Sequence, residues 1–248
     1  MATKAIGIDI GGTGIKGGLV DLSTGSMASD RIRIDTPQPA TPEAVAETVA
    51  EILATADWDG PVGCALPGVV QRGVVRTAAN IDESWIGTDA QDLFGRVTGR
   101  EVSLLNDADA AGLAEVAFGA AQEQGGTVIM VTLGTGIGSA LFHDGVLVPN
   151  AELGHLMMGK KSAERRMSAT ARKARGLDWQ DWAEELSEYF GYVESLLWPE
   201  LFVVGGGVSK KSELWLPHIT ARTPIVVAEL RNNAGIVGAA CAVPEHQR

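Results

Sequence analysis

The sequence predicts an α/β protein of two domains, each built around a sheet that contains a β-hairpin. Strand-like runs at 4–10 and 15–22 flank the turn Gly-Gly-Thr-Gly, which is the pattern of a hairpin. The same arrangement returns where runs at 127–133 and 137–148 flank a Gly-Thr-Gly turn. A repeat of architecture without close sequence similarity indicates two domains of related fold. We expect a smaller domain at 1–105 and a larger one at 106–248.

Helical and strand patterns continue between and after the two hairpins. Thr41 and Pro42 are typical of a helix start. The last element is rich in Gly and Ala, and we expect it to pack back on the first domain. The further elements are expected as a strand-like run at 27–35, a helix at 42–56, a strand ending in a loop at 61–68, a strand running into a small-residue helix at 101–121, helices at 162–198, a strand, glycine loop and helix start at 201–211, and a helix at about 232–244.

The composition excludes several classes of protein. The 248 residues are 45% hydrophobic and 21% charged, as in ordinary globular proteins, and no apolar run approaches the roughly 20 residues of a membrane span. The formal net charge of −11 argues against nucleic-acid and membrane binding. The first residues pass directly into a strand pattern without a signal peptide, and Cys64 and Cys241 make no disulfide framework or zinc cluster. We therefore expect a cytoplasmic protein.

The glycines of the two turns allow backbone N–H groups to approach a phosphate, because no Cβ intervenes. Dinucleotide sites and P-loops use similar glycines, but their loop opens a helix. Here Gly14-Ile15-Lys16 lacks the Gly-Lys-Ser/Thr ending and leads into a strand. Either turn alone could be a plain hairpin turn. Two facing turns, preceded by Asp9 and Thr132, could clamp a phosphate chain, with Asp9 holding magnesium directly or through water.

A carboxylate at a strand end is the predicted catalytic base. Asp107 follows Asn106 where a strand meets a helix, and α/β proteins place ligands at such strand ends. Phosphoryl transfer to an alcohol needs a group that accepts the hydroxyl proton. The alternative, which the pattern alone favours, is that Asn-Asp only caps the helix.

A second polar cluster is Glu152-Leu-Gly-His155. A Glu-x-x-His pair on a helix can bind di-iron, but such a site needs two of these motifs and the sequence has one. Gly154 is unfavourable within a helix, so the motif indicates a loop that lines a pocket. The alternative is that the lone histidine has a structural role.

Taken in order, the motifs resemble one protein family along nearly the whole chain. DIGGTGIK, LPG, NDAD, TLGTGIGSA, ELGH and VVGGGVSKK are similar to the motifs of the ROK family of sugar kinases. This resemblance implies the two-domain actin-like, hexokinase-like (ribonuclease H-like) ATPase fold. Within the family, ELGHLMMGKKSAERR, PELFVVGGGVSKK and LRNNAGIVGAA most resemble the polyphosphate glucokinases. Those enzymes phosphorylate glucose with inorganic polyphosphate, and often with ATP as well.

The resemblance also implies ligands and site residues. It implies a homodimer that uses Mg²⁺ with polyphosphate or ATP, and Asp107 as the base on the 6-hydroxyl of glucose. The sugar would contact Asn106, Asp107, Glu152, His155 and Glu164. The donor would contact Asp9, Gly11, Gly12, Thr13, Gly14, Lys16, Thr132, Gly134, Thr135, Gly136, Gly138, Gly206 and Gly207. Many ROK kinases carry zinc-binding cysteines just after the Gly-His pair, but this chain has none there, so we expect no structural zinc.

A basic stretch at 160–175 contrasts with the acidic chain. It holds seven cations and one acid, Glu164. Arginine forks suit phosphate oxygens, and a linear polyanion needs a row of cations. We therefore expect Lys160, Lys161, Arg165 and Arg166 to guide polyphosphate. The alternative is a solvated helix face whose cations pair with the acidic run at 181–188.

Three functions remain open on this basis. The leading one is a glucokinase that uses polyphosphate and ATP. The second is an ATP-only ROK hexokinase for glucose, mannose, fructose or an N-acetylated amino sugar. The third is a non-catalytic sugar-sensing protein such as a repressor, which would need an added DNA-binding domain before the first strand.

Overall fold

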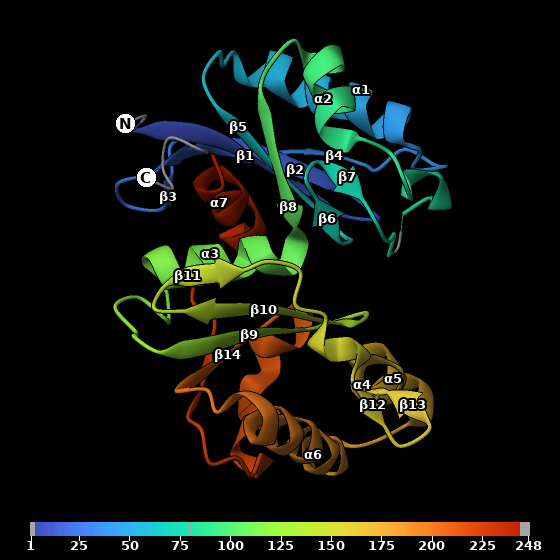
Figure 1. Cartoon of the computed structure of the whole chain (residues 1–248), viewed down its shortest axis with the longest axis vertical. Helices are drawn as coiled ribbons and strands as arrows, with labels where there is room; N and C mark the ends of the chain where they lie inside the picture. Colours follow the sequence, from blue (N-terminus) through green and yellow to red (C-terminus); the bar gives the residue numbers. More distant parts are fainter. Residues whose placement is uncertain (1–2, 80, 244–248) are drawn as a thin grey trace. The chain divides into compact units, whose positions relative to one another are not determined.

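The computed structural model describes residues 3–79 and 81–243 and contains two compact units. Unit 1 comprises Met1–Ala114 and Asn232–Arg248, and unit 2 comprises Glu115–Arg231 (Figure 1). The boundary between them lies within helix α3 (Asp107–Phe118), whereas the sequence analysis places it near residue 105. The chain therefore leaves unit 1 within a helix and returns to it through its last helix.

Unit 1 is built on a mixed sheet in which the first two strands form the predicted hairpin. Strands β1 and β2 are antiparallel, whereas β1, β5 and β8 run parallel, in the order β3-β2-β1-β5-β8, and β4 pairs with β2. The run predicted at 27–35 is thus two short strands. The bounds are β1 (Lys4–Ile10), β2 (Ile15–Asp21), β3 (Ser26–Met27), β4 (Ile32–Ile34), β5 (Val62–Leu66) and β8 (Val102–Asn106), with a small hairpin of β6 (Val70–Gln71) and β7 (Val74–Val75).

Two helices cover one face of this sheet. Helix α1 (Pro42–Ala56) begins where the sequence predicts, because the Thr41 hydroxyl accepts a hydrogen bond from the Ala44 N–H. Helix α2 (Ala90–Thr98) lies beside α1 and follows the 3₁₀ turn η1 (Glu83–Trp85). Their apolar faces share a core with the alternate residues of β1 that point toward them, namely Ile6, Ile8 and Ile10.

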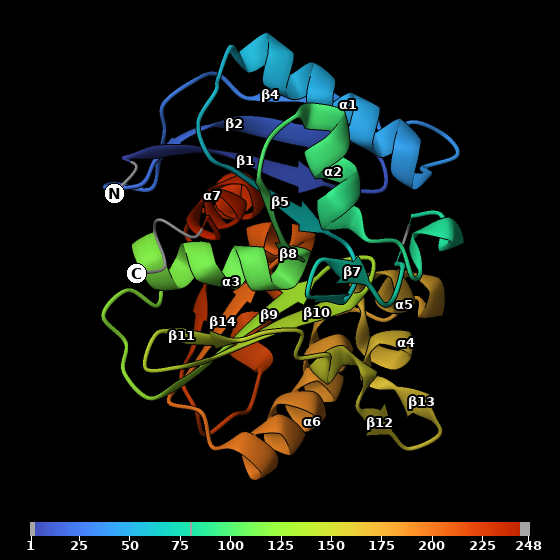
Figure 2. The ribbon, with the colours of Figure 1, turned by 45° about the horizontal axis from the view of Figure 1, so that its top comes forward.

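The opposite face of the sheet is covered by helix α7 (Ala234–Cys241), which contacts β1 and β5 (Figure 2). Gly7 and Gly63 make this contact possible. A Cβ atom at Gly7 would lie 1.7 Å from the Ile236 carbonyl oxygen, and one at Gly63 would lie 1.7 Å from the Ala239 carbonyl oxygen. The helix backbone therefore rests directly on the strand backbone, and only glycine fits at both strand positions.

Unit 2 repeats the strand arrangement of unit 1. Its sheet has the order β11-β10-β9-β14-β15, with β9 antiparallel to β10 and parallel to β14. The predicted duplication of a hairpin-containing sheet is therefore confirmed at the level of topology. The bounds are β9 (Thr127–Leu133), β10 (Ile137–His143), β11 (Val146–Val148), β14 (Leu201–Gly205) and β15 (Ile225–Val227).

The helices of unit 2 follow its hairpin and enclose an aromatic core. Trp182, Phe190 and Phe202 are fully buried there. After the glycine loop the chain forms a kinked 3₁₀ segment rather than an α-helix. The bounds are η2 (Leu153–His155), β12 (Met157–Met158), β13 (Lys161–Ser162), α4 (Ala163–Met167), α5 (Ala169–Arg175), α6 (Trp179–Leu197), η3 (Gly207–Leu214), η4 (Leu216–His218) and η5 (Arg231–Asn233). None of the helices in the described part of the chain has the length and apolar character of a membrane span.

Replacing Gly7 with alanine should destabilise unit 1, because α7 would have to move away from β1. We expect a loss of about 1–3 kcal/mol in the free energy of unfolding, the usual effect of overpacking a filled core. Gly191→Ala is the matched control, since its Cβ would meet nothing within 4 Å inside α6 and alanine favours a helix. Urea unfolding followed by circular dichroism measures both. An unchanged midpoint for Gly7→Ala would contradict the close approach of α7.

Candidate functional site

The first glycine turn, at 11–14, connects β1 to β2 in unit 1. The Gly11 N–H donates to the Gly14 carbonyl at 3.2 Å, and three side chains donate to the remaining turn carbonyls. These donors are Arg33 to Thr13, Thr36 to Gly11, and Gln38 to Gly12. The N–H groups of residues 12–14 make no hydrogen bond with any residue that the structure describes. They are therefore available to bind an anion.

Asp9 stands at the end of β1 beside this turn. Its carboxylate forms an ion pair with Lys16 on β2 at 3.2 Å, and the two residues are register partners in the hairpin. Gly235 at the start of α7 leaves room for Asp9, since a Cβ there would lie 2.9 Å from the carboxyl carbon. The pair is only partly exposed, with 21% of the Asp9 side chain and 32% of the Lys16 side chain accessible. One carboxylate and one ammonium group thus lie together at the predicted donor site.

Magnesium bound to phosphates fits this donor set better than a metal held by protein alone. Among the described residues, no group of three His, Cys, Asp or Glu side chains could hold a metal ion. Mg²⁺ usually keeps several waters and takes one or two carboxylates together with substrate phosphates. Asp9 can supply one such carboxylate, and the remaining ligands would come from water and the donor.

Asn106 and Asp107 lie where β8 runs into α3. The Asn106 side chain is buried and accepts hydrogen bonds from the N–H groups of Ala108 and Asp109, while its amide donates to the Gly68 carbonyl at 3.1 Å. Asn106 therefore caps the helix, as the structural alternative predicts. Asp107 is exposed on the first turn of α3, and one of its oxygens accepts from the Ala108 N–H.

The second glycine turn, between β9 and β10 in unit 2, is supported by a carboxylate. The Gly134 N–H donates to the Gly136 carbonyl at 3.0 Å, and the Ile137 N–H donates to Glu164 Oε2 at 3.0 Å. A Cβ at Gly136 would lie 2.2 Å from that oxygen, so only glycine permits this contact. The structure thus places the predicted sugar acid Glu164 directly against the predicted donor turn.

The Gly206 loop lies beside the same turn. Gly205 pairs with Thr132 in the sheet, and Gly206 has a φ of +82° with its Cβ direction blocked by the Leu133 backbone. Gly206 therefore needs to be glycine for both conformation and space. Within unit 2 the end of β9, the second turn and the loop that starts at Gly205 form one continuous surface of backbone.

Glu152 precedes the short 3₁₀ turn η2 as its N-cap, and His155 is the last residue of that turn. The Glu152 carboxylate lies 3.7 Å from His155 Nδ1. Burial raises the pKa of Glu152, the neighbouring Glu164 carboxylate adds to the rise, and His155 opposes it. Three of the predicted sugar-binding side chains are thus close enough to influence one another electrostatically.

The cations of the basic stretch divide into two groups. Arg166 and Arg175 form ion pairs with Glu185 or Glu188 on α6, and Arg172 stacks on Trp179 with 3.7 Å between the guanidinium carbon and the ring centroid. Four cations are exposed and form no ion pair with a described residue, namely Lys160, Lys161, Arg165 and Lys173. The exposed cations therefore remain available for the expected polyphosphate track. The paired arginines instead match the alternative, in which the cations pair with the acidic run at 181–188.

Sequence reasoning missed the three side chains that support the first turn, Arg33, Thr36 and Gln38. They come from β4 and the segment after it. Nothing in the local sequence indicates that β4 pairs with the turn end of β2, where Ile34 lies opposite Ile15. A strand assignment for 32–34 with this register would have brought Arg33 to the turn.

Comparisons with known proteins agree with these features. The model of the ROK family matches residues 5–172 of the chain. The chain belongs to the ROK family. Other ROK proteins are similar over almost the full length. The polyphosphate glucokinase of Mycobacterium tuberculosis (strain CDC 1551 / Oshkosh) is 52% identical over 237 residues, which cover 95% of this chain and 89% of that protein.

Two solved ROK structures are also similar. The inorganic polyphosphate/ATP-glucomannokinase from Arthrobacter sp. strain KM has a TM-score of 0.90 and 54% identity, and the match covers 96% of this chain and 97% of that one. A ROK family glucokinase from Streptomyces griseus in complex with glucose and AMPPNP has a TM-score of 0.81 and 28% identity, covering 98% and 99%. The actin-like, hexokinase-like fold expected from the sequence is confirmed.

The raised pKa of Glu152 predicts a stability change with pH. A carboxyl group with a higher pKa in the folded state stabilises the fold below its unfolded pKa, and this contribution is lost as the pH rises through the folded pKa. We therefore expect Glu152→Gln to melt at a higher temperature than the wild type at about pH 7, and to lose this advantage below the ordinary glutamate pKa of about 4.3. Scanning calorimetry at both pH values tests this. A variant less stable than the wild type at neutral pH would contradict the assigned burial.

Proposed function

We propose that this chain is a glucokinase that transfers a phosphoryl group from inorganic polyphosphate or ATP to the 6-hydroxyl of glucose. The observation that carries the proposal is the 52% identity to the curated polyphosphate glucokinase along 95% of the chain. The glucose and AMPPNP in the more distant Streptomyces griseus structure support a sugar acceptor and a nucleotide donor. The glycine turns and the exposed Asp107 supply the groups that this reaction needs.

The acceptor half of the reaction rests on Asp107. Its carboxylate takes the proton of the 6-hydroxyl as that oxygen attacks the terminal phosphorus, and the bond from phosphorus to the donor's bridging oxygen breaks. Asn106 uses its second amide hydrogen for a neighbouring hydroxyl, since the first is bound to the Gly68 carbonyl. Glu152, His155 and Glu164 bind the other hydroxyls and fix the sugar's orientation.

The donor half rests on backbone amides. The N–H groups of residues 12–14, which have no partner among the described residues, and those of the second turn bind phosphate oxygens. Thr132 and Gly138 border the second turn, and the Gly206–Gly207 loop lies near the nucleotide when ATP is the donor. Asp9 and water would hold Mg²⁺, which would neutralise negative charge on the phosphates. Lys16 would then leave its ion pair with Asp9 and contact the donor instead.

The same proposal includes a second sugar substrate, a homodimeric assembly and a cytoplasmic location. The name of the Arthrobacter relative includes mannose as an acceptor sugar, so we propose mannose as a second substrate. Cys64 and Cys241 are both buried as free thiols, which suits a reducing cytoplasm. A homodimer is proposed on family grounds.

A coupled assay for glucose 6-phosphate tests the proposed reaction. With ATP and polyphosphate supplied separately, the wild type should produce glucose 6-phosphate from either donor. Asp107→Asn should lower kcat by about 10²–10⁴-fold, the usual worth of general-base catalysis, with little change in glucose affinity. Turnover with ATP alone would favour the ATP-only hexokinase, and no turnover with either donor would favour a sugar sensor.

The polyphosphate track is proposed on three exposed cations in the first part of the basic stretch, Lys160, Lys161 and Arg165. Arg166 belongs to the set expected from the sequence, but its guanidinium lies 2.8 Å from Glu188 and 3.8 Å from Glu185. It could serve the track only by leaving these partners. Long polyanions bind through summed, salt-sensitive contacts, so the three exposed residues are sufficient to favour polyphosphate over a short donor.

Replacing Lys161 and Arg165 together with glutamine should raise the polyphosphate KM several-fold at low salt and leave the ATP KM within about twofold. Lys173→Gln is the matched control, because Lys173 is an exposed cation of the same stretch on α5. The coupled assay at two salt concentrations measures both constants. An equal effect of Lys173→Gln would show that net charge, rather than a track, governs polyphosphate use.

A further inference from the structure

Helix α4, which carries Glu164, is too short to hold its own orientation. It has five residues, with Ser162 as its N-cap and the Ala163 N–H bound to the Leu156 carbonyl at 2.8 Å. Isolated helices of this length are unstable, because nucleation fixes several residues for few hydrogen bonds. The position of α4 must therefore come from what packs against it.

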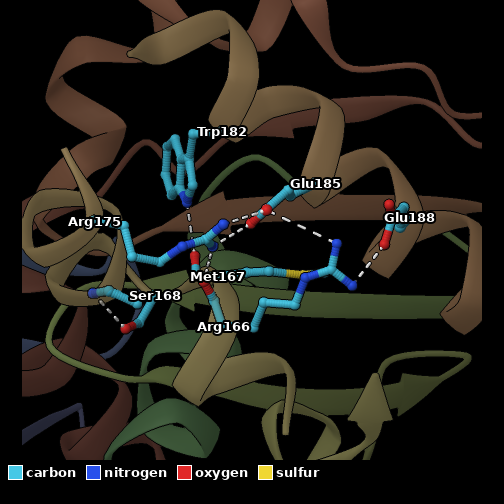
Figure 3. A network of polar contacts seen from close by, with 8 residues as sticks. Arg166, Met167, Ser168, Arg175, Trp182, Glu185 and Glu188 are labelled. Carbon is cyan, nitrogen blue, oxygen red and sulfur yellow. Dashed lines mark hydrogen bonds and ion pairs between the residues drawn. The ribbon is translucent and has the colours of Figure 1, made fainter. Parts of the chain in front are cut away.

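Among the neighbours of α4, which include α5 and η2, helix α6 supplies the charged contacts. One face of α6 presents Trp182, Glu185 and Glu188 to the α4–α5 corner, as Figure 3 shows. The Trp182 indole N–H donates to the Met167 carbonyl at 2.8 Å, at the last residue of α4. Glu188 contacts Arg166 but is 54% exposed, and exposed ion pairs contribute little. The stronger charged contact lies at Glu185.

Glu185 is the centre of this network. Its side chain is only 17% exposed, and its two oxygens accept hydrogen bonds of 2.6 Å from the two terminal nitrogens of Arg175. These hydrogen bonds lower the pKa of the Glu185 carboxyl. Arg175 donates in turn to the Arg166 carbonyl at 3.0 Å, and the Arg166 guanidinium lies 3.8 Å from Glu185. A bidentate arginine–carboxylate pair fixes direction as well as distance.

The network leads to the site through one residue. Glu164 lies in the first turn of α4, next in the chain to Arg165 and Arg166, and its Oε2 accepts from the Ile137 N–H. Gly136 packs closely against that oxygen, since a Cβ at Gly136 would lie 2.2 Å from it. A small rotation of α4 would therefore move the Glu164 carboxylate relative to the second turn and to Glu152.

We propose that Glu185 is a positioning residue for the sugar site: by anchoring Arg175 and Arg166 it fixes α4, and so sets where the Glu164 carboxylate meets the sugar. This inference rests on the proposed function, in which Glu164 binds a sugar hydroxyl. It also gives Arg166 and Arg175 a scaffold role, distinct from the exposed cations of the track.

Calorimetric titration of the full-length chain with glucose, without a donor, tests the proposal. Glu185→Gln should raise the glucose Kd by about threefold to tenfold, the size of one misaligned hydrogen bond in a binding constant. Glu184→Gln is the matched control, since it removes the same charge from the exposed face of α6, and it should stay within about twofold. A structural defect alone would lower the binding stoichiometry or the melting temperature without moving Kd.

A double-mutant cycle shows whether Glu185 acts through Glu164. In the Glu164→Gln background, Glu185→Gln should change the glucose Kd by less than about twofold. A folded Glu185→Gln variant with the wild-type Kd, or full additivity in the cycle, would overturn the proposal. Arg175→Lys keeps the charge but loses the fork, so it should weaken glucose binding even if Glu185→Gln does not fold. If the wild type bound no glucose, the proposed function would fail instead.

Discussion

The hydrogen bond from the Ile137 N–H to the Glu164 carboxylate is the contact that joins the two halves of the chemistry within unit 2. The N–H donor favours the charged form of this carboxylate, but a phosphate bound at the same turn, as proposed, would be repelled by it. In the proposed function a sugar hydroxyl lowers this repulsion by donating a hydrogen bond to the carboxylate. The pKa of Glu152 is raised chiefly by burial, and the neighbouring Glu164 carboxylate adds a smaller increase.

The two glycine turns connect equivalent strands of the two sheets, but different kinds of hydrogen bond hold them in place. Side chains that donate to carbonyls, including the Arg33 guanidinium, hold the first turn, whereas a carboxylate that accepts from an amide holds the second. At the first turn the charges are balanced, since Arg33 pairs with Asp35 and Lys16 pairs with Asp9. At the second turn the Glu164 carboxylate accepts from the Ile137 N–H, so the proposed donor would meet a negative charge there. The two sheets thus share a backbone arrangement, while the side chains that support their turns differ.

The sequence predicted the repeated hairpin, the start of α1 and the order of the motifs, because glycine turns, alternation and capping are local signals. It offered pairing of the basic stretch with the acidic run at 181–188 as an alternative, but charge counting could not show that Arg166 and Arg175 are the arginines that pair with Glu185 and Glu188. Arg33 was missed for a similar reason, because its role depends on the pairing of β4 with β2. Local pattern thus identified the backbone of the site, while the partners of its charged side chains required the tertiary structure.

Gly7 and Gly63 form the surface of the unit 1 sheet on which its last helix packs. Neither glycine has a side chain, so the α7 backbone packs directly against the strands at these two positions. Helix α7 comes from the last part of the described chain. Unit 2 is continuous from Glu115 to Arg231, so its core can form while this surface is still uncovered. Contacts between distant segments carry a loop-closure cost and form late. Because Gly235 in α7 also packs against Asp9, the carboxylate proposed to hold the metal has its full surroundings only when this last helix is in place.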